Sequence, residues 1–175
     1  MINDYEATQP IVPPQDTINT NGNSDVISTL NGLIEICKDG EFGFKTAEEG
    51  AERQDLKSVF SGFSQQRAVF ADVLQGLVRS LGGEPESGGS LGGSIRRGWM
   101  DLKSAVTGNS DEAILNECER MEDCAKDAYA KAMTENLPPK IADVINQQSQ
   151  AVLAAHNRVR SLRNAEDYKT ATSNN

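Results

Sequence analysis

Four polar side chains fall on otherwise apolar helical stripes and are the residues best placed to do chemistry: Glu41, Gln66, Glu122 and Gln148. A carboxylate in an apolar setting is costly unless it is paired, protonated or bound to a metal. Carboxylates, together with imidazoles, hold and bridge iron or manganese. The two glutamates therefore raise the question of a metal site in a helical core.

The ligand set for such a site is incomplete. Bundle proteins that hold two irons take a Glu from each of two helices and a Glu-x-x-His motif from each of the other two. Here the motif positions read Gln66-Arg67-Ala68-Val69 and Gln148-Ser149-Gln150-Ala151. Glutamine replaces glutamate and an aliphatic residue replaces histidine. A neutral amide is a poor iron ligand, and an aliphatic side chain cannot ligate at all.

Two hypotheses follow from these residues. In the first, the four polar side chains named above form a buried hydrogen-bonded layer that fixes helix register, with no cofactor and no catalytic residue, and Arg67 pairs with one carboxylate. In the second, Glu41, Glu119 and Glu122 hold iron or manganese. The first predicts that Glu41→Gln or Glu122→Gln is neutral or stabilising, because a buried charge disappears. The second predicts loss of bound metal.

The histidine and the cysteines offer little further chemistry. His156 is the only histidine in the sequence and lies one residue off the predicted inner stripe of its helix. Histidine chemistry needs an orienting partner, and none stands at ligand spacing, so we expect a surface or flank residue. Cys37 and Cys118 fall on predicted buried stripes, where cysteine behaves as a small hydrophobe. Three cysteines do not make a disulfide framework.

The helices expected to carry these residues belong to an internal sequence repeat. The segment Ile34–Glu41 reappears as Leu115–Glu122, and both copies place a cysteine four residues before a glutamate. Phe63–Gln66 is echoed by Ile145–Gln148 at nearly the same offset. A nearly constant offset predicts two related helix pairs, and two helix pairs make a four-helix bundle.

Apolar residues recurring every three or four positions set the expected helices. We expect helices over residues 24–50, 55–81, 111–135 and 140–163. In the second of these the predicted core face is Val59, Phe63, Gln66, Phe70, Val73 and Leu77. The first pair and the second pair are joined by short turns and are therefore antiparallel.

The connection between the two pairs is long and contains a short amphipathic helix over residues 91–106. One long crossover is typical of the ferritin-like arrangement, so the expected fold is an all-α, ferritin-like antiparallel four-helix bundle. Residues 1–23 are expected to be a disordered tail, residues 24–165 the bundle, and residues 166–175 a flexible C-terminal tail.

Composition limits the partners and the location. The net charge of −9 makes a nucleic-acid backbone or an anionic membrane surface an unfavourable partner. No run of about 18 apolar residues is present to span a membrane. The N-terminus, Met1–Tyr5, lacks the basic and apolar regions of a signal peptide. A cytoplasmic protein is the expectation.

Several segments resemble a bacterial family of ferritin-like four-helix-bundle proteins of unknown function. They are Leu30–Phe44, Gln65–Arg67, Arg97–Lys103 and Cys118–Asp123, and the resemblance covers residues 24–165. The chain also looks distantly like the rubrerythrins, through Gly40-Glu41 and Glu119-x-x-Glu122, although their histidine-bearing positions are absent.

The resemblance implies a fold more than an activity. With the di-iron ligands degraded, it implies a non-enzymatic bundle that acts by association, in stress protection or as a scaffold. The alternative that it leaves open is a di-metal carboxylate protein with oxidase or metal-handling activity. By analogy with ferritin-like bundles, which often pair along helix faces, a homo-oligomer is expected.

Overall fold

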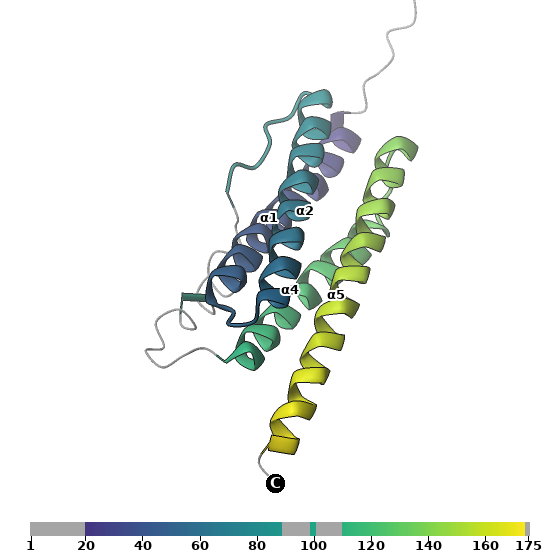
Figure 1. Ribbon diagram of the computed structural model, residues 1–175. Helices are drawn as coiled ribbons and strands as arrows, with labels where there is room; N and C mark the ends of the chain where they lie inside the picture. Colours follow the sequence, from purple (N-terminus) through teal and green to yellow (C-terminus); the bar gives the residue numbers. More distant parts are fainter. Residues whose placement is uncertain (1–19, 89–98, 101–109, 174–175) are drawn as a thin grey trace, which may run out of the picture.

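The computed structural model describes residues 20–88, 99–100 and 110–173, and its long elements are all helices. They are α1 (Thr20–Gly50), α2 (Gln54–Ser80), α4 (Asp111–Ala132) and α5 (Pro139–Ser173). Figure 1 shows α1 beside α2 and α4 beside α5, with α5 reaching past the other helices at its C-terminal end. The expected all-α four-helix architecture is confirmed.

Local sequence signals explain where α4 begins and where α2 ends. The Ser110 side chain accepts a hydrogen bond from the backbone N–H of Ala113 (3.2 Å), and Asp111 and Glu112 follow in the first turn of α4. Helix α2 ends before Gly82, whose φ of 78° is a conformation that glycine adopts at little cost. These two ends lie close to the residues that the sequence indicated.

The turn between α1 and α2 is tied to α4. The backbone N–H groups of Glu52 and Arg53 donate to the two carboxylate oxygens of Asp111, at 2.8 and 3.3 Å. The Arg53 guanidinium also pairs with Glu166 of α5. The two helix pairs are therefore held together at this end by polar contacts.

The core forms two apolar clusters, one toward each end of the bundle. One is built around Leu30, Ile34, Leu74, Tyr129 and Ile145. The other is built around aromatic and aliphatic side chains from the opposite end, including Phe44, Phe60, Trp99, Leu115 and Val159. Buried polar residues, described below, lie between them. Scarce aromatic residues and abundant aliphatic ones suit this helix-on-helix packing.

Three expectations are corrected by the structure. Helix α1 begins at Thr20, inside the segment assigned to the tail. Helix α5 does not end near Arg163 but runs to Ser173, because residues 164–173 contain neither glycine nor proline to stop it. It thus takes in most of the segment expected to be a flexible C-terminal tail.

The third correction concerns the buried face of α2. It is Leu56, Phe60, Ser64, Arg67, Ala71, Leu74 and Val78, one residue round from the predicted face. Apolar residues occupy both stripes, so periodicity alone could not separate them. Most of the predicted N-terminal tail and most of the predicted crossover helix lie outside the described residues, although Trp99 is described and buried.

Candidate functional site

The centre of the bundle holds a buried ion pair between α2 and α4. Arg67 Nη2 donates to both carboxylate oxygens of Glu122, at 2.7 and 2.9 Å. The two side chains are 1% and 0% exposed. Arg67 reaches this position because it stands on the buried stripe of α2, and Glu122 stands on the buried stripe of α4. The cation beside the glutamate is therefore part of the chain.

The surroundings of the guanidinium are shaped to hold it. Its carbon lies 6.0 Å from the centre of the Phe44 ring and 5.8 Å from that of Phe70, close enough for cation–π attraction. A methyl group built on Gly40 would lie 3.1 Å from Arg67 Cγ, so the glycine leaves room for the arginine stem. Arg67 Nη1 also donates to Gln66 Oε1 at 3.2 Å.

Burial and pairing act on Glu122 in opposite directions. Removal from water raises the pKa of the Glu122 carboxyl group above its ordinary value, and the neighbouring Arg67 opposes that rise. A buried carboxylate without such a partner would be strongly unfavourable. The pair is therefore a unit, and neither charge is tolerated there without the other.

A second polar chain links α1, α4 and α5 next to this pair. Tyr129 donates its hydroxyl proton to Gln148 Oε1 at 2.7 Å, and Cys37 Sγ lies 3.1 Å from the same hydroxyl. Gln148 Nε2 donates to the backbone carbonyl of Phe70 at 3.4 Å. Because the hydroxyl proton goes to Gln148, the Cys37 thiol is the donor to Tyr129. The chain satisfies these buried groups in series.

The buried thiols are poorly suited to nucleophilic chemistry. Burial raises the pKa of Cys37 to about 11. Burial also raises the pKa of Cys118 well above its ordinary value. Since the thiolate is the reactive form, both cysteines stay protonated and inert near neutral pH.

The structure brings only part of the predicted polar layer together. Glu122 and Gln148 are buried. Gln66 is half-buried and contacts the layer through Arg67. Glu41 is also half-buried, but it lies in a surface groove between α1 and α2 that includes Lys45 and Ser64.

The metal-ligand set of the second hypothesis is not assembled. Both oxygens of Glu122 bind Arg67, and Glu119 pairs with Arg163 Nη1 at 2.6 Å. Glu41 lies in the groove between α1 and α2. Within the described ranges, no group of three or more His, Cys, Asp or Glu side chains is placed to hold a metal ion. The three carboxylates of that hypothesis are therefore not gathered into one group among the described residues.

His156 has a partner that the sequence did not reveal. It is buried, and its Nε2 lies 2.9 Å from Asp123 Oδ1, with the ring N–H as the donor. A hydrogen bond from Lys126 lowers the pKa of the Asp123 carboxyl group, and His156 lowers it further. Asp123 is on α4 and His156 on α5, so only the register of two packed helices brings them together. Their sequence positions give no signal of it.

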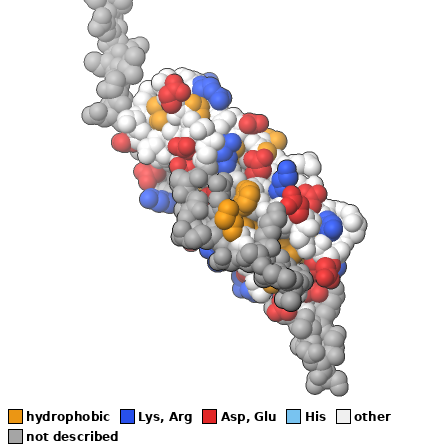
Figure 2. All heavy atoms as spheres, turned by 90° about the vertical axis from the view of Figure 1, so that its left-hand side faces the viewer, with side chains coloured by type: hydrophobic (Ala, Val, Ile, Leu, Met, Phe, Trp, Pro, Cys, Tyr) orange, Lys and Arg blue, Asp and Glu red, His pale blue; other side chains and the backbone are white. Residues whose placement is uncertain are grey.

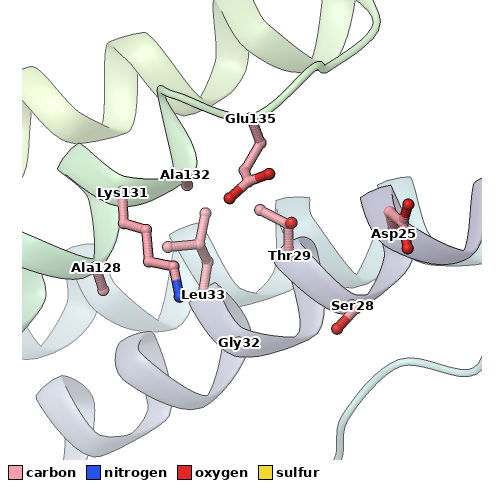
Figure 3. A pocket seen from close by; sticks show the side chains of 9 residues that line it. All are labelled: Asp25, Ser28, Thr29, Gly32, Leu33, Ala128, Lys131, Ala132 and Glu135. Atoms are coloured by element: carbon pink, nitrogen blue, oxygen red, sulfur yellow. The ribbon is translucent and has the colours of Figure 1, made fainter. Parts of the chain in front are cut away.

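The described part of the surface includes a groove with charged residues around it. A groove of about 460 Å³ lies between the first half of α1 and the end of α4, and Figure 3 shows Asp25, Lys131 and Glu135 around it. The two carboxylates and the ammonium group around this groove are on exposed residues. Its buried lining residues are Leu33 and Ala132. On the face in Figure 2, acidic and basic side chains are interspersed and hydrophobic patches are small. None of the described helices has the length and apolar character required to cross a membrane.

Comparison with known proteins supports the fold. A family described as "Domain of unknown function (DUF2383)" matches residues 25–135. No curated protein matches the sequence. Among solved structures, a point mutant of Dps1 from Mycobacterium smegmatis superposes with a TM-score of 0.67 at 17% identity, covering 82% of this chain and 97% of that one.

Two further structures have the same fold. The dodecameric thioferritin of Bacteroides fragilis, a bacterioferritin-related protein, gives a TM-score of 0.68 at 14% identity, covering 85% of this chain and 90% of that one. A two-domain protein of Anabaena variabilis, with DJ-1/ThiJ/PfpI-like and ferritin-like domains, gives 0.67 at 15% identity. That match covers 82% of this chain and only 40% of the other. The expected ferritin-like bundle is confirmed.

Proposed function

Because the chain belongs to the DUF2383 family and has the ferritin-like fold, we propose that it is a non-enzymatic bundle that acts by association, with an arginine in place of a metal at its centre. The observation that carries this proposal is the buried Arg67–Glu122 pair. A guanidinium supplies the positive charge that a carboxylate in an apolar core requires. The expected buried polar layer is thus proposed as structural.

Charge balance supports the assignment. One guanidinium faces one carboxylate, and a metal ion at the same place would add positive charge beside Arg67. It would also have to displace two hydrogen bonds from Glu122. The neutral amide of Gln148 is already engaged by Tyr129 and Phe70. Among the described residues around the pair, no group of free donors is left for iron or manganese.

Association is supported by the kind of fold. The ferritin-like protein of B. fragilis is described as a dodecamer, and the long helices of such bundles offer extended faces for packing. We therefore propose a homo-oligomer as the working form.

The test is metal content measured on the full chain purified without chelators. Elemental mass spectrometry is expected to find substoichiometric iron, manganese and zinc. Added Fe²⁺ or Mn²⁺ is expected to leave the midpoint of thermal unfolding unchanged, since a metal that binds the folded chain would raise it. Sedimentation of the same sample tests association.

The matched variant is Glu41→Gln/Glu122→Gln. Stoichiometric metal in the parent that is absent from this variant would overturn the structural assignment and favour the metal-handling alternative. The structural assignment is supported if metal is substoichiometric in both the parent and the variant. The variant is then also expected to be less stable than the parent, because Arg67 loses its counter-ion.

A further inference from the structure

Helix α2 carries more apolar surface than the bundle buries. Besides its buried stripe, it has Val69 and Val73, one turn apart, at 58% and 42% exposure. Phe63, Phe70 and Leu77 beside them are only partly buried. Exposed apolar residues that adjoin one another on a helix mark a contact surface more often than scattered ones do.

This surface also lacks charge. The exposed positions of α2 between its ends are Ser58, Gly62, Gln65, Val69, Asp72, Val73, Gly76, Arg79 and Ser80. From Ser58 to Gly76, Asp72 is the only charged residue among them. The exposed side of α5 carries charge nearer its ends, at Lys140, Asp143, Arg158 and Arg160, and none from Val144 to Asn157, so Leu153 on that helix offers a matched uncharged surface for comparison. Copies of a chain with a net charge of −9 repel each other least where charge is scarce.

Two glycines in this face are unexplained by the packing of the single chain. A methyl group built on Gly62 or on Gly76 would meet nothing within 4 Å. Glycine weakens a helix interior, so a glycine with open space around it has no benefit within the single chain. Both glycines stand two turns from Val69, one on each side. The two glycines are therefore placed symmetrically about Val69.

We propose that the face of α2 from Ser58 to Ser80 packs against the same face of a second copy, with the two α2 helices antiparallel and crossing near Val69. A two-fold contact uses the same patch on both copies, so residues at equal distances on either side of the crossing point meet across it. The crossing places Gly62 of one copy opposite Gly76 of the other, where the absent side chains let the backbones approach.

The same arrangement accommodates the one charge. About the two-fold axis, Asp72 of one copy lies beside Gln65 of the other, on the same edge of the contact. An amide N–H can donate to that carboxylate, while the two Asp72 side chains stay apart. This inference rests on the proposed function, which is association, and it identifies the surface through which the copies associate.

The test compares the full chain with Val69→Glu and with Leu153→Glu by sedimentation equilibrium. Leu153, on α5, is 47% exposed and serves as the matched apolar control. The parent is expected at an even multiple of 18.9 kDa. Val69→Glu is expected to weaken self-association at least tenfold, since like charges would meet at the axis, and Leu153→Glu is expected to leave it unchanged. Unfolding midpoints establish that each variant is folded.

A cross-link locates the axis independently. In a Cys124→Ser background, Val69→Cys is expected to give a disulfide-linked dimer on mild oxidation, and Leu153→Cys is not. An oligomer that Val69→Glu leaves intact, or equal cross-linking of both variants, overturns this surface but not association. A monomeric parent overturns both the proposed surface and association. The measurement of metal content does not depend on either result.

Discussion

The two copies of the sequence repeat put equivalent glutamates in different places. Glu122 on α4 is fully buried and bound to Arg67, while Glu41 on α1 is half-buried in a surface groove. The cysteines four residues earlier, Cys37 and Cys118, are both buried. The two copies therefore share a register at the cysteine and differ one turn later.

The difference follows from what each helix presents to Arg67. Helix α4 presents a carboxylate, and α1 presents Gly40, against which the aliphatic stem of the arginine lies. A second carboxylate at the centre would leave one negative charge uncompensated by the single guanidinium. Sequence repetition thus specifies the helices, whereas charge balance decides which glutamate enters the core.

The sharpest way to break this comparison is to neutralise each glutamate in turn. Glu122→Gln is expected to lower the free energy of unfolding by about 3–5 kcal/mol, because Arg67 would remain buried without its counter-ion. Glu41→Gln is expected to change it by less than about 0.5 kcal/mol, as for a surface position. Urea unfolding at neutral pH measures both. For Glu122 this replaces the neutral or stabilising effect expected from the sequence alone.

Equal effects of the two substitutions would contradict the asymmetry. If both variants were as stable as the parent, Glu122 would carry no ion pair of consequence in solution. If both lost several kcal/mol, Glu41 would belong to the core in spite of its position in the groove.

A double substitution sharpens the same point. Arg67→Met alone is expected to cost about 3–5 kcal/mol, because it leaves Glu122 as an unpaired buried charge. Arg67→Met/Glu122→Leu removes both charges and is expected to cost less than either single change, since an apolar pair can replace a buried ion pair. Double-mutant-cycle analysis of urea midpoints gives the coupling. Additive losses would show that the two side chains do not act as a unit.

The sequence could predict the helices but not this asymmetry. The number of helices, the long connection, the stop near Gly82 and the cap at Ser110 all follow from local signals. The rotation of α2 by one residue does not, because apolar residues line two adjacent stripes. Arg67 did carry a signal, since it stands in an otherwise uncharged run between Phe60 and Ala71. The His156–Asp123 contact depends on the relative register of two helices, which no local pattern encodes.

The glycines of α1 test how closely the two repeat copies interlock. A methyl group on Gly43 would lie 2.2 Å from Met121 Sδ and 2.7 Å from Trp99 Nε1. Gly43→Ala is therefore expected to destabilise the fold by about 1–3 kcal/mol through overpacking. Gly32→Ala, with nothing within 4 Å, is expected to stabilise it by about 0.5–1 kcal/mol. Thermal unfolding of the two variants measures the contrast, and a stabilising Gly43→Ala would mean that α1 and α4 are further apart.

Alkaline pH tests the part of the repeat that the two copies share. Burial raises the pKa of Cys37 from 9.0 to about 11. Between these values the unfolded chain has lost the thiol proton and the folded chain keeps it. Since the folded state binds more protons, stability falls as the pH rises from about 9 to about 11.

At pH 10 the Cys37 contribution to this loss is about 1.4 kcal/mol relative to neutral pH. Cys37→Ala is expected to be less stable at pH 7, where its Tyr129 contact is missed, but to lose about that much less on going to pH 10. Urea unfolding of parent and variant at both pH values gives the difference. An identical loss of stability at alkaline pH in both chains would mean that Cys37 is open to solvent. The two copies of the repeat would then differ at the cysteine as well as at the glutamate.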